Sequence, residues 1–144
     1  MEVQLLTKTI MTAAEALGYS TVVGDVTQKA CSLPELPALC LSRPVLRDKQ
    51  GRQSGVITYR LECSLIQPAD EIDVAADEEA SREADTKLLQ TLYNHALTII
   101  EAVDALDEVC DVACISSTPS KGRVTPYGDV TLKLVFDVKL KFRK

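Results

Sequence analysis

The stretch that decides the fold is residues 130–142, Val130-Thr-Leu-Lys-Leu-Val-Phe-Asp-Val-Lys-Leu-Lys-Phe142. Apolar residues at the even positions alternate with residues that, apart from Val135, are polar. Because side chains on a β-strand point alternately to opposite faces, one face of this segment is apolar and the other is polar. A helix would scatter the same residues around its circumference. The pattern therefore predicts a strand on the order of 40 Å long, whose apolar face another layer must cover.

The whole chain has the length and composition of a single globular domain, residues 1–144. Hydrophobic residues make up 46% and charged residues 26%, which is typical of folded proteins. Aromatic residues make up 4% and Trp is absent, so the core must consist mainly of Leu, Val, Ile and Ala. The net charge of −5 argues against a nucleic-acid binder, which usually gathers a basic surplus on one face.

Targeting features and cysteine usage favour a cytoplasmic protein without a membrane partner. No apolar run approaches the ~18 residues of a membrane span. Residues 1–8 lack the basic head and continuous apolar block of a signal peptide. The cysteines are odd in number and show no CxxC spacing, which is typical of reduced thiols. They are Cys31, Cys40, Cys63, Cys110 and Cys114.

Two stretches carry the three-and-four spacing of amphipathic helices. The first is residues 2–17, and Gly18 stands where a left-handed cap would end it. The second is residues 88–106, whose apolar positions share an arc of about 140° on a helical wheel. These positions are Leu88, Leu89, Leu92, Tyr93, Ala96, Ile99, Ile100, Val103 and Leu106. We expect the second helix to lie across the sheet and to supply most of the core.

Three further segments have the character of strands. Residues 38–43 form one that Pro44 ends or limits to an edge, and residues 57–65 alternate clearly between apolar and polar positions. A polar turn at 48–55 joins these two into a hairpin. Residues 109–116 form another strand, connected to the last one by a turn at 118–129. The order α-β-β-α-β-β predicts an α+β fold with about four antiparallel strands in two hairpins and two helices on one face.

Catalytic, cofactor and metal sites are not indicated by any pattern in the sequence. His95, the only histidine, borders the apolar arc of the second helix, where a packing role is more plausible than a Cys–His nucleophile pair. Cys110 and Cys114 lack the paired ligands of a tetrahedral metal site, so we expect small buried thiols. The glycines form no phosphate-binding motif, and no nucleophile elbow or zincin motif occurs. We therefore predict a protein that is not an enzyme and needs no cofactor.

Charge is distributed unevenly along the chain. Residues 70–85 contain eight acidic residues against Arg82 as the single base. They lack the order of ligands of a calcium loop, and acidic residues suit the start of a helix because of its dipole. Residues 129–144 contain five bases and two acids. This asymmetry suits head-to-tail assembly of identical chains, although two solvated charged surfaces would account for it equally well.

Several of these features together resemble the tail-terminator and tail-completion proteins of long-tailed bacteriophages and prophages. The resemblance covers nearly the whole chain: the N-terminal helix, the hairpin carrying residues 47–61, the long helix 88–106, the polar turn 121–129 and the alternating last strand. It is one of element order and local character, because the family has no catalytic motif to match.

The resemblance implies a structural role in the virion tail, with assembly in the cytoplasm of the bacterial host. Such proteins form rings, typically hexameric, that cap the tail tube and join it to the head, so the expected partners are copies of the chain, the tube protein and head-completion proteins. By position, we expect contacts at Lys49, Arg52, Lys121, Arg123, Lys139 and Lys141. The alternative is a small ligand- or peptide-binding α+β module, or a vestigial enzyme, that uses a pocket between the long helix and the sheet.

Overall fold

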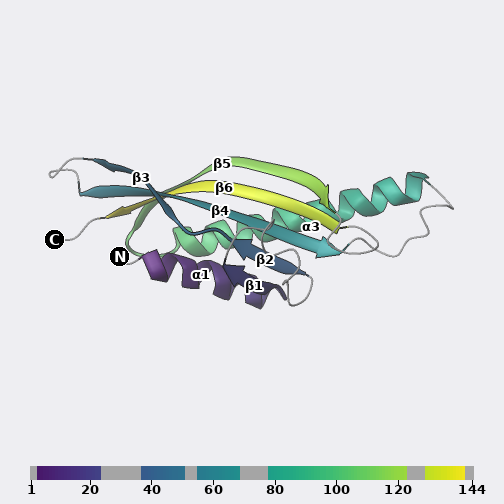
Figure 1. Cartoon of the computed structure of the whole chain (residues 1–144), viewed down its shortest axis with the longest axis horizontal. Coiled ribbons are helices and arrows are strands. Elements are labelled where there is room, and N and C mark those ends of the chain that lie inside the picture. The colour runs from purple at the N-terminus through teal and green to yellow at the C-terminus, as the bar shows by residue number, and fades with distance from the viewer. Residues whose placement is uncertain (1–2, 24–36, 51–54, 69–77, 123–128, 142–144) are drawn as a thin grey trace.

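The computed structural model describes residues 3–23, 37–50, 55–68, 78–122 and 129–141, without the side chains of 48–50, 78–85, 121–122 and 129. Two helices lie on one face of a long, curved sheet (Figure 1). This arrangement confirms the predicted α+β class. In chain order the elements are α1 (Val3–Ala16), β1 (Ser20–Val23), β2 (Ala38–Leu41), β3 (Val45–Gln50), β4 (Val56–Pro68), α3 (Glu78–Asp104), β5 (Val109–Gly122) and β6 (Asp129–Lys141).

The sheet differs in detail from the predicted one. It has six strands in the order β1-β2-β4-β6-β5, and β3 also pairs with β4. The β1–β2 pair is parallel and the other pairs are antiparallel, so the prediction of about four wholly antiparallel strands was wrong. The reason is length: β1 and β2 have four residues each, which is too short for alternation to reveal a strand's partner or direction.

The predicted strand at 38–43 is in fact the first of two short strands along the same edge of β4. The Ser42 amide still donates to the carbonyl of Glu62 at 2.9 Å. Pairing then lapses at Arg43 and Pro44 and resumes at Val45, opposite Arg60. Proline has no N–H to donate, so the ladder is interrupted where it stands. The predicted turn at 48–55 begins later than expected, because β3 continues to Gln50.

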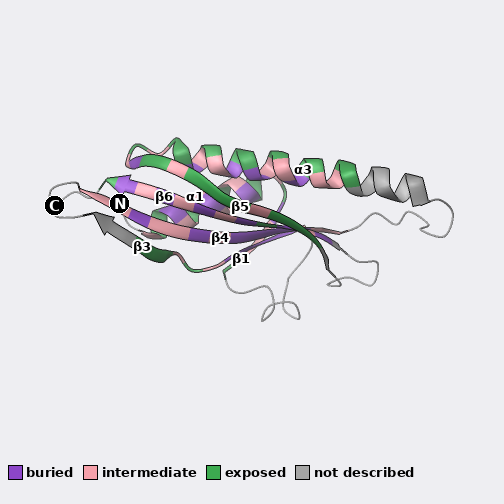
Figure 2. Ribbon diagram, turned by 90° about the horizontal axis from the view of Figure 1, so that it is seen from above, coloured by how far each residue is buried: buried purple, intermediate pink, exposed green. Residues whose placement is uncertain are grey.

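The last strand is central, as its pattern predicts. β6 lies between β4 and β5, and it pairs with β4 along the whole of that strand, with Leu61 opposite Phe136. All of its even positions from Val130 to Leu140 are buried, and Phe136 is fully inaccessible. Burying a side chain of this size contributes about 1.5–3 kcal/mol. Figure 2 shows the buried positions along β4 and β6 beneath the two helices.

Both helices cover the same face of the sheet, as predicted. α1 buries Leu6, Ile10 and Ala14 in the same core cluster as the sheet residues. α3 adds four buried positions with the expected spacing, and Leu88, Tyr93, Ile100 and Leu106 pack against that cluster at its margin. The four buried positions are Leu92, Ala96, Ile99 and Val103. The start of α3 at Glu78 places part of the acidic segment within a helix, whereas residues 70–77 lie outside the described part of the chain.

Strand β5 departs from the prediction in two ways. It extends to Gly122 and includes Pro119, which is compatible with its position at the edge of the sheet. Register shifts between Val109 and Asp111 and between Cys114 and Ser116 interrupt its alternation. The expectation that Cys110 and Cys114 are buried was therefore wrong, and both thiols are exposed. Cys40 and Cys63 are the buried thiols of the described residues.

Candidate functional site

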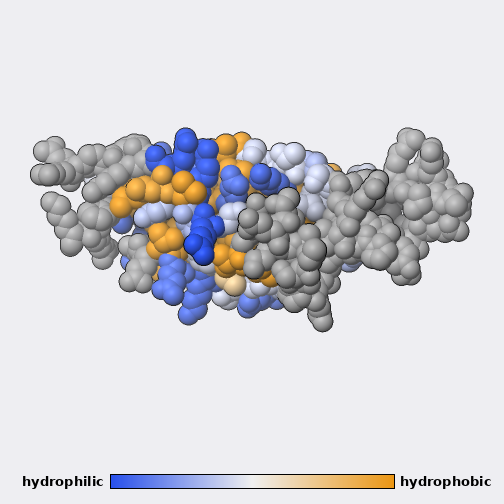
Figure 3. Space-filling model, viewed as in Figure 1, coloured by the Kyte–Doolittle hydropathy of each residue, from blue (hydrophilic) through white to orange (hydrophobic). Residues whose placement is uncertain are grey.

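The edge strand β3 exposes apolar side chains between two arginines. Val45 and Leu46 are 58% and 57% exposed, and Arg43 and Arg47 are exposed on either side of them. A hydrophobic strip beside hydrophilic side chains is visible in the region of β3 (Figure 3). We call residues 43–47 the β3 edge segment. Exposed aliphatic residues on an unpaired strand edge are unusual in monomers, because such an edge is a template for pairing with another chain.

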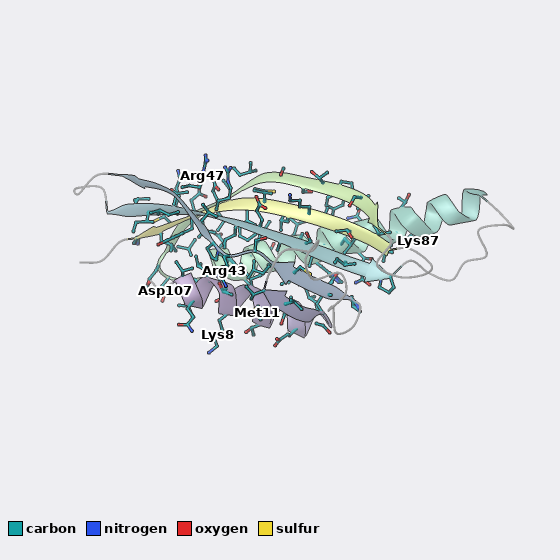
Figure 4. The ribbon with its side chains drawn as sticks, in the orientation of Figure 1. Lys8, Met11, Arg43, Arg47, Lys87 and Asp107 are labelled. Carbon is teal, nitrogen blue, oxygen red and sulfur yellow. The ribbon has the colours of Figure 1, made fainter. Side chains whose placement is uncertain are left out.

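The start of β5 forms a second exposed edge, with the opposite charge. Asp107, Cys110 and Asp111 are exposed, and Ile115 is 50% exposed at a register shift. We call residues 107–115 the β5 edge segment. Neither Asp107 nor Asp111 forms an ion pair with any described residue, and the same holds for Arg43 and Arg47. Arg43, Arg47 and Asp107 are labelled in Figure 4.

The two edge segments lie on opposite sides of one sheet. β3 pairs with β4, β4 with β6, and β6 with β5, so two strands separate the segments. Figure 2 shows β3 and the first half of β5 at opposite borders of the sheet. Across the sheet, Val45 is opposite Arg60, Arg60 is opposite Asp137, and Asp137 is opposite Ala113. One subunit therefore presents two different, unsatisfied strand edges at about the same height.

The structure places the predicted contact residues in three settings. Lys49 lies in β3 and Lys121 near the end of β5, but their side chains lie outside the described set, as do residues Arg52 and Arg123 altogether. Lys139 is half-buried on β6, and Lys141 is exposed near the end of that strand. Lys49 and Lys141 come close through β4, because Lys49 is opposite Ile57 and Lys141 is opposite Val56. Lys121 lies at the other end of the sheet, opposite Val130.

The face of the sheet turned away from the helices carries charged cross-strand pairs. Arg60 donates to Asp137 through Nε at 2.9 Å and Nη2 at 3.2 Å, which is a bidentate contact between directly opposed residues. Lys133 and Glu62 approach to 4.0 Å and are more exposed. The hydrogen bond to Asp137 raises the pKa of Arg60. These pairs fix the register of β4 against β6 and leave the edge segments to make other contacts.

A helix cap positions the one buried polar cluster that we find among the described side chains. Gly18 has a φ of 94°, and its amide donates to the Glu15 carbonyl, while the Tyr19 amide donates to the Ala14 carbonyl, each at 3.0 Å. This is the Schellman arrangement, in which a left-handed glycine ends the helix and the next residue packs back against it. The cap confirms the role predicted for Gly18. It also turns Tyr19 inward, where it is 3% exposed.

Tyr19 joins three elements through its hydroxyl group. The Gln67 amide at the end of β4 donates to the Tyr19 hydroxyl at 3.0 Å, and that hydroxyl lies 2.7 Å from Nδ1 of His95 on α3. Since the hydroxyl accepts from Gln67, it donates to Nδ1, and the neutral imidazole carries its proton on Nε2. The two rings meet edge to face at a centroid distance of 5.4 Å. His95 thus has the boundary role predicted for it, with two partners that the sequence did not indicate.

Burial shifts both titrating groups of this cluster toward their neutral forms. Desolvation raises the pKa of Tyr19, and the hydrogen bond from Gln67 partly offsets that effect. Desolvation lowers the pKa of His95. A neutral tyrosine and a neutral imidazole are the states that the hydrogen bonds require. The cluster therefore stabilises the junction of α1, β4 and α3, and it contains no activated nucleophile.

A groove of about 370 Å³ lies between the two helices. Its lining is mainly apolar, with Leu5 and Ala102 on its two walls and Lys8 as its one charged residue. It is thus separate from the helix–sheet pocket that the alternative function required. Small residues at Ala13 and Ala16 make the groove possible because they leave space between the helices.

The described residues offer little to metal or redox chemistry. No three His, Cys, Asp or Glu side chains of this part of the chain converge as metal ligands. Burial raises the pKa of Cys63 to about 12, so this thiol stays protonated and unreactive at neutral pH. Cys114 donates to the Ser116 carbonyl at 3.8 Å, a weak contact within its own strand. Within the helices that the structure describes, none has the length and apolar character needed to cross a membrane.

The edge segments were not predicted as sites, although the sequence contains a signal for one of them. An aliphatic pair directly after Pro44, flanked by Arg43 and Arg47, is an unusual sequence for a solvent-exposed segment. The partners of His95 had no such signal, because Tyr19 and Gln67 are 76 and 28 positions away from it in the sequence. Comparison with known proteins adds no assignment: no protein-family model and no curated protein matches this chain.

Proposed function

We propose that this chain is a structural phage-tail protein, which forms a ring that terminates the tail tube and joins it to the head. The observation that carries the proposal is the pair of exposed edges on opposite sides of one sheet. A closed ring of identical subunits needs two different surfaces on each subunit, so that each copy binds the next head to tail. The β3 and β5 edge segments meet that requirement.

The phage assignment rests on the resemblance described above, and the observed element order agrees with the features that carry it. An N-terminal helix, the β3–β4 hairpin, the long helix α3 and the β5–β6 hairpin follow one another in the chain. The proposed partners are copies of the chain, the tail tube protein and head-completion proteins. Their place of assembly is the cytoplasm of the bacterial host, and their final location is the virion tail. The protein acts by assembly, without enzymatic chemistry or a cofactor.

The first test is the mass of the protein in solution, measured by light scattering on a size-exclusion column over a range of concentrations. We expect a species of about six subunits. Leu46→Lys should reduce its mass, because a charge replaces an apolar side chain at the proposed contact. Leu97→Lys on α3 is the matched control, since Leu97 is also 57% exposed but lies on a helix. A monomer at every concentration, both alone and with assembled tail tubes, would contradict the proposal.

A ligand-binding module is the second candidate, and the groove between α1 and α3 is the observation that favours it. Its apolar lining suits a small apolar ligand. A fluorescent apolar probe that binds with one-to-one stoichiometry and is lost in Ala102→Leu, with the protein remaining monomeric, would favour this candidate. Genes for capsid, portal or tape-measure proteins beside the coding sequence would favour the first.

A further inference from the structure

We infer that the contact between neighbouring copies is an antiparallel pairing of β3 with β5, held in register by Arg43 and Arg47 against Asp111 and Asp107. This inference rests on the proposed function, because it specifies the contact by which the ring would close. The occupant of each edge is a second copy of the same chain. The argument uses strand direction, charge and spacing, one step at a time.

Strand direction follows from the sheet itself. β3 runs antiparallel to β4, β4 to β6, and β6 to β5, so β3 and β5 are antiparallel to each other within one subunit. If neighbouring subunits continue the sheet, strand directions are preserved from copy to copy. The β5 of one copy then meets the β3 of the next copy in the antiparallel sense. Free N–H and C=O groups on the two edges can form the hydrogen bonds of such a pair.

Charge and spacing select the register. Arg43 and Arg47 are four residues apart, and so are Asp107 and Asp111. In the antiparallel sense, a single register places Arg43 opposite Asp111 and Arg47 opposite Asp107. All four side chains are exposed, and none of them forms an ion pair with a residue in the described ranges. Each edge therefore offers charges that the subunit itself leaves unmatched, and opposite charges at equal spacing fix a register.

The residues between these charges are compatible with a strand-to-strand contact. Val45 and Leu46 lie between the two arginines, and Val109 and Cys110 lie between the two aspartates. Pairing would cover the exposed surface of Val45 and Leu46 and the exposed Cys110 thiol. Like-charged edges would repel one another, so two β3 edges or two β5 edges would not pair. The arrangement therefore selects head-to-tail contact over a symmetric dimer.

Reversal of the charges tests the inference. Arg43→Glu with Arg47→Glu, and separately Asp107→Arg with Asp111→Arg, should each weaken assembly about tenfold or more in concentration. Mixed in equal amounts, the two variants should assemble again, because each then offers the other a complementary edge, in rings with an even number of subunits. Lys8→Glu with Lys87→Glu is the control, since it changes the net charge as much as the arginine variant does, on exposed helical positions (Figure 4).

Crosslinking provides a second test that does not depend on charge. Val45→Cys places a thiol near the expected position of Cys110 in the neighbouring copy. A bis-maleimide with a reach of about 8 Å should join these two cysteines, and mass spectrometry identifies the linked peptides. Within one chain, three strand spacings of ~4.8 Å separate the two edges, so the reagent is too short to link them internally. Leu97→Cys, which has nearly the same exposure, should give no link to Cys110.

The outcomes separate this inference from the proposed function. Loss of assembly in both charge variants, recovery on mixing and a link between residue 45 and Cys110 support the register. A ring that forms normally in both variants and yields no such link overturns the register but leaves the ring intact. Failure of the mixture to assemble, with each variant folded by circular dichroism, also overturns the register. A wild-type chain that neither assembles nor crosslinks overturns both.

Discussion

Tyr19 shows how a single residue ties distant parts of the chain together. Its hydroxyl accepts from Gln67 and donates to Nδ1 of His95, so it links residues of β4 and α3 to the end of α1. An unsatisfied buried donor or acceptor costs about 1–3 kcal/mol, so each member of this cluster depends on the other two. Protonation of His95 would place a second N–H against the hydroxyl and force it to rotate.

We therefore predict that His95 makes the protein less stable in mild acid. Its pKa is lowered in the folded protein from an ordinary value of 6.5, so the unfolded chain binds more protons below that pH. The free energy of unfolding should fall as the pH drops below about 6.5, and the loss should level off below the folded-state pKa. The slope for one proton cannot exceed about 1.4 kcal/mol per pH unit, and solvent contact of the ring keeps it smaller.

Urea unfolding between pH 5 and pH 7.5 measures this effect, with His95→Gln as the reference. The variant has no group that titrates in this range at position 95, while the acidic residues of the chain remain the same. The difference in unfolding free energy between the two proteins isolates the histidine. An unchanged difference across this range would show that His95 titrates alike in the folded and unfolded states.

At the scale of the elements, the end of α1 determines where the chain goes next. Its last turn closes on a left-handed Gly18, after which Tyr19 is buried and β1 begins at Ser20. The Ser20 amide then donates to the Pro37 carbonyl at 2.9 Å, beside the parallel pairing of β1 with β2. A change in the cap would therefore affect the helix, the tyrosine and the first strand together.

We predict that Gly18→Ala destabilises the fold by about 1–2 kcal/mol, because an L-residue other than glycine is strained at this φ. No atom lies within 4 Å of the position that a Cβ would occupy, so the cost comes from backbone conformation and not from a clash. Gly18→Asn is the control, since asparagine tolerates the left-handed region better, and it should lose less. Thermal or urea unfolding of the three proteins gives the order. Equal stability of all three would contradict the role assigned to the cap.

At the scale of the whole molecule, the sheet is covered on one face by helices and exposed along two edges. A six-stranded sheet could have ended in short, charged or bulged edges that discourage pairing. β5 does have register shifts, but β3 exposes Val45 and Leu46 beside its free edge. The unmatched arginines on one side and aspartates on the other give the subunit a polarity that a monomer would not need.

Because these charges are matched between copies, we predict that assembly depends on salt. Screening shortens the reach of charge interactions from ~10 Å at 0.1 M to ~3 Å at 1 M ionic strength. The average mass by light scattering should therefore fall between these two conditions at a protein concentration near the midpoint of assembly. The control variant Lys8→Glu with Lys87→Glu should show the same salt dependence as the wild type. A mass that rises with salt would mean that apolar contact, and not charge, dominates the interface.

The sequence by itself determined the periodic elements and the core. The alternation in residues 130–142 predicts β6 and its buried face, and the spacing in 88–106 predicts the core positions of α3, because burial requires these repeats of 2 and 3.6 residues. Only the tertiary structure decided the strand order, the parallel β1, the exposure of Cys110 and Cys114, and the contact of Tyr19 with His95 and Gln67. These features depend on which segments meet in space, and no local repeat encodes a pairing between residues far apart in the chain.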